Sequence, residues 1–315
     1  MSAPMSDRVS DPAAPSVPAA APFEPGAAYA VAAERVRAHD HDRWLAGLWA
    51  PEDRRRHLYA LYAFSDEIAR IRDVVSDPLP GEVRARWWAD MLAGTRGGEG
   101  AGHPIAAALL DTIRRFDLPP EPFERLIEAR IFDLYDDPMP TLADLDTYCD
   151  DTVGTVIGLA CRILDGACDD PATEAAIAAA GRAWGVTGLL RALPFHASRG
   201  QIFLPADLVE AHGVDRTDLF AGRATPALRA LHAALRAHAR DALVETRRRV
   251  AHIPIVAAPA FLPLALVEPW LDRMDRPDFD PFHTSTELAP WHRHWRLWRS
   301  ARRARRAARR RGELM

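Results

Sequence analysis

Apolar residues recur every three or four positions along most of the chain, a spacing that places them on one face of an α-helix. The alternating apolar and polar runs that are typical of strands are nearly absent. The pattern predicts one all-α domain, a helical bundle from about residue 27 to residue 299. The helices that it predicts are 27–47, 51–75, 81–93, 103–116, 119–135, 141–165, 171–193, 205–212, 224–251 and 258–273.

Capping residues support several of these boundaries. Pro51 and Pro119 stand where a proline fits the first turn of a helix, and Thr141 with Asp144 has the spacing of a capping box. Gly166 follows the end of one predicted helix. Pro194 is expected to end or kink the helix that contains it, because its ring clashes with the carbonyl group four residues earlier.

The chain ends differ in composition from the predicted domain. Residues 1–26 are rich in alanine and proline and lack the unbroken apolar core of a secretory signal, so we predict a disordered tail. The longest apolar run begins at Ile253 and is broken by three prolines, so no transmembrane helix is expected. The few cysteines form no closely spaced pair, which indicates a reducing, cytoplasmic environment.

Charge is unevenly distributed. The net charge is −4, but residues 291–311 contain ten arginines, so the preceding part is distinctly acidic. Residues 300–315 are expected to form a basic tail. Just before it, Trp291, Trp295 and Trp298 share one helical stripe, which is typical of an interfacial helix on an anionic membrane. The alternative is that these tryptophans pack on the bundle as its last helix; no fold motif favours nucleic-acid binding.

Two stretches carry candidate chemistry. In residues 58–77, Asp66 and Arg70 are four residues apart, which on a helix predicts an ordinary surface ion pair. In residues 189–209, Arg191, His196 and Arg199 flank the helix break and could hold a diphosphate or another anion, although a loop with ordinary charges has the same composition.

A third stretch contains small residues at helical spacing. Gly154 and Gly158 allow either close helix packing or room for a long ligand beside the backbone.

Taken together, these stretches resemble the squalene/phytoene synthase family. The residues "YALYAFSDEIARIRD", "YCDDTVGTV" and "LLRALPFHASRGQIFLP" follow, in order, the family patterns YALYAFCRxxDDxxD, YCxxVAGxVG and ILRDxxEDxxRGRxYLP. The resemblance implies an isoprenoid-synthase-type bundle with a central cavity. It also implies a reaction in which magnesium ions, held by two aspartate-rich helix faces, assist the departure of diphosphate.

The chain departs from these patterns at the metal-binding acids. Ala69, Arg70, Ala192 and His196 stand where the family has aspartates, and Asp73 is the one aspartate kept in the first motif. One carboxylate binds magnesium weakly, so no metal cofactor is expected unless the site has been remodelled.

Other family positions are kept. The resemblance assigns Asp73 and Tyr148 to the reaction site, and Tyr62, Arg191 and Arg199 to ligand or diphosphate contacts. Arg70 and His196 could replace metal charge by contacting an anionic headgroup directly.

This combination is similar to a divergent branch of the family that includes the mitochondrial respiratory complex I assembly factor with a synthase-like domain. That similarity implies a protein without synthase activity. Its partners would be subunits of a respiratory complex or an isoprenoid or prenyl diphosphate-like lipid, and it would lie in the cytoplasm or on the inner membrane. An active isoprenyl diphosphate transferase with a remodelled magnesium site, and a ligand-free helical scaffold, remain the alternatives.

Overall fold

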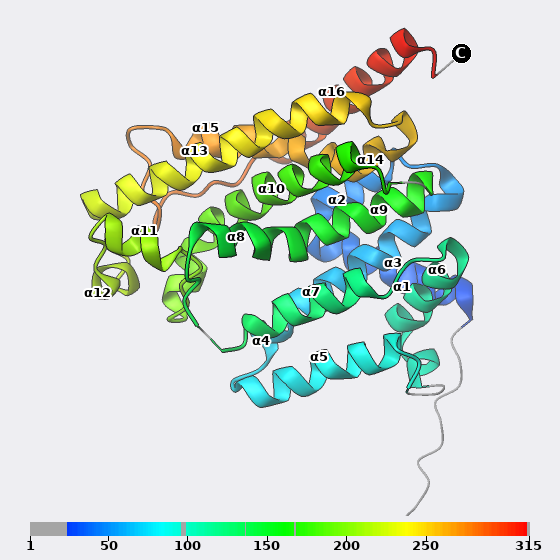
Figure 1. Cartoon of the computed structure of the whole chain (residues 1–315), viewed down its shortest axis with the longest axis horizontal. Helices are drawn as coiled ribbons and strands as arrows, with labels where there is room; N and C mark the ends of the chain where they lie inside the picture. The colour runs from blue at the N-terminus through cyan, green and yellow to red at the C-terminus, as the bar shows by residue number, and fades with distance from the viewer. Residues whose placement is uncertain (1–23, 96–98, 136, 167, 314–315) are drawn as a thin grey trace, which may run out of the picture.

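The structure is a computed structural model that describes residues 24–95, 99–135, 137–166 and 168–313 (Figure 1). In this part of the chain every regular element is helical, which confirms the predicted all-α class. The N-terminal half contains α1 (Pro25–His39), α2 (His41–Gly47), α3 (Glu52–Ala69), α4 (Ile71–Val74), α5 (Pro78–Leu92), η1 (Glu99–Gly102), α6 (Pro104–Phe116), α7 (Glu121–Phe132), α8 (Leu142–Cys149), η2 (Asp150–Gly154) and α9 (Thr155–Asp165).

The C-terminal half contains α10 (Pro171–Ser198), α11 (Ala206–Ala211), α12 (Arg216–Phe220), α13 (Pro226–Arg249), η3 (Val250–His252), η4 (Ile255–Ala257), α14 (Ala258–Phe261), η5 (Leu262–Leu266), α15 (Val267–Met274) and α16 (Pro290–Arg311). The predicted disordered tail lies almost wholly outside the described residues. Its last positions, from Pro25 on, already belong to α1.

The centre of the bundle is α3, which is buried on every side over nine consecutive residues, His57–Ser65. Its neighbours are α1 and α6 on one side and α9 on the other, while α10 packs along α13 (Figure 1). The helices α3, α7 and α10 and the α8–α9 pair have their long axes in roughly the same direction. The C-terminal ends of α3, α7 and α10 and the start of α8 therefore meet at one end of the bundle, which we call the motif face.

Several predicted helices are broken where backbone groups find other partners. The predicted helix 27–47 breaks at Asp40, whose carboxylate accepts a hydrogen bond from the Arg43 amide and so caps α2. The predicted helix 51–75 breaks at Arg70, between α3 and α4. Residues 142–165 are helical throughout, but a π turn, η2, separates α8 from α9.

The prediction that the helix ends near Pro194 was wrong. α10 continues through the proline to Ser198, because the residues on both sides of Pro194 are held in the core: Leu193 is 3% exposed and Ala197 4%. Packing of these side chains offsets the missing hydrogen bond of the proline. The sequence pattern also missed α12. A helix was expected at the tryptophans, and α16 forms there, but it continues to Arg311 through the segment expected to be a basic tail.

The small residues near position 154 serve close packing. A Cβ atom added to Gly181 of α10 would lie 2.9 Å from the amide nitrogen of Gly154 and 3.0 Å from its Cα. A Cβ at Gly185 would lie 2.6 Å from the Cys149 sulfur. The backbone of α10 therefore lies directly against the π turn. The glycine at position 154 thus allows close helix packing, and it does not leave room for a long ligand.

The apolar run after Ile253 forms part of the core. Residues Ile255–Met274 are long and apolar enough to cross a membrane by composition, with a mean hydropathy of 1.4, yet 67% of that stretch is buried inside the bundle. Along this stretch 3₁₀ and α turns alternate, as η4, α14, η5 and α15 follow one another without a gap.

The basic C-terminal segment is the last helix of the bundle. α16 runs across the expected boundary at residue 299 and buries Leu297, Ala301 and Ala308. The tryptophans do not form this packed face: Trp291 is 72% exposed, Trp295 41% and Trp298 43%. The helix thus packs through its small and aliphatic residues and leaves the tryptophan stripe outside.

Candidate functional site

An ion pair joins the first and last family motifs at the motif face. The guanidinium of Arg199, at the end of α10, donates to a carboxylate oxygen of Asp73 in α4 at 2.9 Å. Both side chains are partly exposed. The one aspartate that survives in the first motif is therefore neutralised by an arginine of the other motif.

A buried polar cluster lies behind this pair. The Arg130 side chain, from α7, donates to the Tyr148 hydroxyl at 2.8 Å and to the Asp133 carboxylate at 3.0 Å, and the Tyr148 hydroxyl donates to the same carboxylate at 3.0 Å. Burial raises the pKa of the Asp133 carboxyl, and the Arg130 guanidinium opposes that shift. One Asp133 oxygen and the Arg130 Nε have no hydrogen-bond partner among the described residues.

Aromatic side chains fill the space between these groups. The Phe203 ring lies 4.5 Å from the His196 ring and 5.9 Å from the Tyr148 ring, measured between centroids. Burial, together with Arg130 and Arg199, lowers the pKa of His196 to about 4. His196 is therefore neutral near pH 7 and adds no positive charge for an anion.

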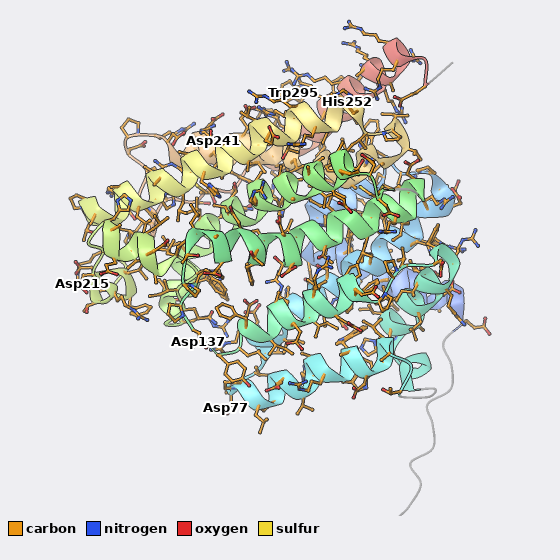
Figure 2. All side chains as sticks on the ribbon, in the orientation of Figure 1. Asp77, Asp137, Asp215, Asp241, His252 and Trp295 are labelled. Atoms are coloured by element: carbon orange, nitrogen blue, oxygen red, sulfur yellow. The ribbon has the colours of Figure 1, made fainter. Side chains whose placement is uncertain are left out.

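Little free volume remains at the motif face. The cavity lined by Phe132, Asp133, Asp137 and Phe203 measures about 10 Å³; Asp137 marks this edge in Figure 2. Ligand sites for small molecules usually measure ~300–1,000 Å³. This small cavity cannot hold a prenyl chain, and a groove of about 460 Å³ begins beside it, lined in part by Arg70, Ile71 and Val74.

The remaining predicted ligand contacts are dispersed. Arg70 lines a separate groove with Arg35, Arg84 and Trp87. Arg191 donates to Glu287 at 2.8 Å, and its guanidinium lies 3.9 Å from the centre of the Trp270 ring.

Tyr62 is buried beneath Arg43, whose guanidinium lies 5.4 Å from the ring centre, and burial raises the pKa of the Tyr62 hydroxyl. Of the predicted site residues, the structure brings together Asp73 with Arg199, and Tyr148 with His196 through Phe203.

The acids near the first motif have long-range partners. Asp66 accepts from Arg35 of α1 at 2.7 Å and contacts His39 at 3.0 Å, and Glu67 lies 3.1 Å from Arg35. The expected pair between Asp66 and Arg70 is therefore wrong. Arg35 comes from a neighbouring helix that packs along α3, and it takes the carboxylate that local spacing would assign to Arg70.

The residues at the motif face do not fit a magnesium site. Positions 69 and 192 are alanines, position 196 is a neutral histidine, and Asp73 is held by Arg199. Magnesium requires several oxygen ligands in near-octahedral geometry. Within the described ranges, no group of three or more histidine, cysteine or acidic side chains is arranged to hold a metal ion.

Sequence reasoning missed Arg130 and Asp133. The sequence does contain a sign of this pair, because an arginine and an aspartate three residues apart near the end of a predicted helix lie on the same face. That spacing is common on exposed helices, and only the packing of α8 against α7 shows that the pair is buried and meets Tyr148.

Comparisons with known proteins agree with this architecture. The sequence matches the Squalene/phytoene synthase family over residues 36–299. It is 31% identical over 254 residues to the rat protein NADH dehydrogenase (ubiquinone) complex I, assembly factor 6, covering 81% of this chain and 76% of that relative. It is also 31% identical over 263 residues to the phytoene synthase of Thermus thermophilus, covering 82% of this chain and 87% of that enzyme.

Two solved synthase structures share this architecture. A dehydrosqualene synthase in complex with a ligand has a TM-score of 0.76 at 20% identity, covering 89% of this chain and 98% of that one, which shows a shared fold. Squalene synthase HpnC from Alicyclobacillus acidocaldarius has a TM-score of 0.72 at 27% identity, covering 82% and 97%. With motifs, family match and fold in agreement, the chain belongs to the squalene/phytoene synthase family.

Proposed function

We propose that this protein is a non-catalytic member of its family. The observation that carries the proposal is the ion pair between Asp73 and Arg199, which occupies the place where the family patterns put metal-binding acids. Ionisation of a prenyl diphosphate places negative charge on the leaving group, and that charge needs a metal or several cations. Here the nearby histidine is neutral and Arg199 is already paired with Asp73. Arg191 is paired with Glu287, and Arg70 lines a separate groove.

The role that we propose is assembly of a respiratory NADH dehydrogenase complex. The support is the 29–31% identity to complex I assembly factor 6 of four mammals, over 81% of this chain. The partners would be subunits of that complex. We place the protein in the cytoplasm, at the inner membrane where such a complex is built; its three buried free cysteines suit a reducing compartment.

Binding of an isoprenoid at the motif face is a less favoured role. A prenyl chain would have to displace Phe203 and His196 from their ring contact, and a diphosphate would compete with Asp73 for Arg199. The similarity to a Thermus phytoene synthase favours the alternative of an active transferase with a remodelled metal site. That alternative requires magnesium to bind at Asp73.

One experiment separates these functions. Purified protein is incubated with radiolabelled farnesyl or geranylgeranyl diphosphate and magnesium, and we expect no head-to-head product above the level of heat-inactivated protein. Steady product formation that Asp73→Asn abolishes would establish the transferase instead.

A cellular experiment tests the assembly role. Deleting the gene in its own cell should lower both the amount of assembled NADH dehydrogenase complex and its activity. Restoring the gene as Asp73→Asn should recover both, because an exposed ion pair contributes only ~0–1 kcal/mol to stability and no metal is lost. Normal complex levels in the deletion strain would contradict the assembly role.

A further inference from the structure

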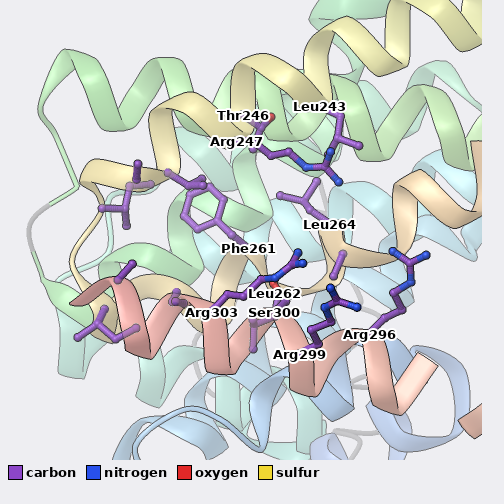
Figure 3. A pocket seen from close by; sticks show the side chains of 18 of the residues that line it. Leu243, Thr246, Arg247, Phe261, Leu262, Leu264, Arg296, Arg299, Ser300 and Arg303 are labelled. Carbon is purple, nitrogen blue, oxygen red and sulfur yellow. The ribbon is translucent and has the colours of Figure 1, made fainter. Parts of the chain in front are cut away.

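A groove separates α13 from α16 on the opposite side of the molecule from the motif face. It measures about 650 Å³, within the ~300–1,000 Å³ range of small-molecule sites. Its floor is apolar and comes from the short helices between the two walls, with Phe261, Leu262 and Leu264 at its centre (Figure 3). No family motif contributes to it.

The rim of the groove is strongly cationic. Five arginines and one glutamate line it, a formal charge of +4. Arg247 projects from α13, and Arg296, Arg299 and Arg303 project from α16, so cations approach the groove from both walls (Figure 3).

The two ends of the groove are tied by hydrogen bonds. At one end Glu268 accepts from Arg247 at 2.9 Å and lies 3.6 Å from Arg296. At the other end Arg311 donates to the Ala251 carbonyl at 2.8 Å. These contacts hold α16 against the rest of the bundle, so the two walls of the groove are fixed relative to each other.

The middle of the rim has cations without acidic partners. Arg299 contacts the Trp295 ring, 4.9 Å from its centre, but forms no ion pair among the described residues. Within the same part of the chain, the exposed side chain of Arg303 forms neither a hydrogen bond nor an ion pair. A guanidinium is well suited to phosphate oxygens, which it binds through two parallel hydrogen bonds.

The surface beside the groove carries exposed tryptophans. Trp295 lines the groove (Figure 2). Trp291 and Trp298 are exposed on the same helix, with 72% and 43% of their surface accessible. Tryptophan favours the headgroup level of a membrane, where its ring is apolar and its N–H group can remain hydrated.

We propose that this groove binds an anionic glycerophospholipid at a membrane surface. One acyl chain lies on the apolar floor between α13 and α16, and the phosphate is held by Arg299 and Arg303. Of the ligands that match a cationic rim, a free phosphate would leave the floor unused, and a nucleic acid has no chain to place on it. The inference does not depend on the assembly role, because it uses no residue of the motif face.

The first test uses a soluble lipid and matched variants. Titration of the full chain with monomeric dihexanoyl phosphatidylglycerol, followed by calorimetry, should show saturable binding, while dihexanoyl phosphatidylcholine, inorganic phosphate and a single-stranded RNA oligomer should bind at least about tenfold more weakly. Arg299→Gln with Arg303→Gln should weaken binding about tenfold or more, since each arginine near an anionic lipid contributes substantially. Arg306→Gln with Arg310→Gln removes the same charge from exposed positions outside the groove and should have a much smaller effect.

The second test fills the groove and leaves every charge in place. Ser300 and Ala307 line the groove, and Ser300→Trp or Ala307→Trp should abolish lipid binding while circular dichroism and melting temperature stay near those of the unaltered protein. Binding to a membrane is measured by sedimentation of the protein with phosphatidylcholine vesicles, with and without phosphatidylglycerol. We expect binding to the vesicles that contain phosphatidylglycerol. Equal losses from the two arginine pairs, undiminished binding in both folded tryptophan variants, or tighter binding of phosphate or RNA than of lipid would overturn the proposal.

Discussion

Single residues of this protein often take partners from distant parts of the chain. Asp73 pairs with Arg199, and Asp66 pairs with Arg35, although closer charged residues are available in the sequence. Tyr29 is a third case: its hydroxyl donates to Asp111 at 2.8 Å and contacts His57 at 2.9 Å. These contacts join α1, α3 and α6, so the loss of this one hydroxyl should weaken the packing of all three helices.

We expect Tyr29→Phe to lower the free energy of unfolding by ~1–3 kcal/mol, because the buried side chains of His57 and Thr112 lose a hydrogen-bond partner. Urea denaturation followed by circular dichroism measures this change.

Tyr135→Phe is the matched control for that substitution. Tyr135 also loses a hydroxyl contact, to Glu82, but its side chain is 48% exposed, and water can satisfy the group that is left. We expect a change within ~0.5 kcal/mol. Equal effects of the two substitutions would mean that the Tyr29 cluster does not stabilise the fold.

At the scale of elements, α10 determines how the bundle is packed. Its glycines allow the helix to lie on the π turn at Gly154, and its C-terminal turn passes Pro194 to deliver Arg199 to the motif face. Helix packing therefore places the ends of two motifs next to each other.

Replacing glycine by alanine at two positions of α10 should change the stability of the protein in opposite directions. Gly181→Ala should destabilise the protein by ~1–3 kcal/mol, because the new methyl group meets the backbone of Gly154, which cannot move away cheaply. Gly188→Ala meets nothing within 4 Å and should stabilise the protein by up to ~1 kcal/mol, since alanine favours helix. Thermal or chemical denaturation of both variants checks this, and destabilisation of similar size at both positions would argue against the close approach at Gly154.

At the scale of the whole molecule, two buried histidines, His57 and His232, and the partly buried His196 make stability depend on pH. Burial lowers the pKa of His57 and of His196 to about 4, and that of His232 to about 3. An exposed histidine has a pKa of ~6.5, so between that value and the lowered one the unfolded chain binds more protons than the folded chain. Stability should therefore fall as the pH drops from about 6.5 toward 4, by at most ~1.4 kcal/mol per pH unit for each histidine.

Asp150 acts in the opposite sense. Burial raises the pKa of its carboxyl to about 6, so over the range below 6 the folded state binds the extra proton and gains stability as the pH falls. His196→Phe isolates one histidine, because it keeps a ring beside Phe203 and removes the titration. The unfolding free energy of this variant, measured from pH 7.5 to 4.5, should fall less steeply than that of the unaltered protein; parallel curves would contradict the assignment.

Much of the fold could be predicted from the sequence. Helical periodicity correctly indicated an all-α bundle and most of its long helices, since each amphipathic face needs only local spacing to be visible. The breaks at Asp40 and Arg70, the helix through Pro194 and the packing of α16 could not be predicted this way. They depend on which side chains are covered by neighbouring helices, and local propensity does not contain that information.

For function, too, some features follow from the sequence and others only from the tertiary structure. The sequence by itself determined the helical class and the loss of the aspartates at positions 69, 70, 192 and 196, because these are facts of residue type and order. Only the tertiary structure decided that Arg199 neutralises Asp73, that Arg191 pairs with Glu287, and that a cationic groove lies between α13 and α16. Charge pairing and cavity shape depend on distances of a few ångströms between segments far apart in the chain, and folding alone sets those distances.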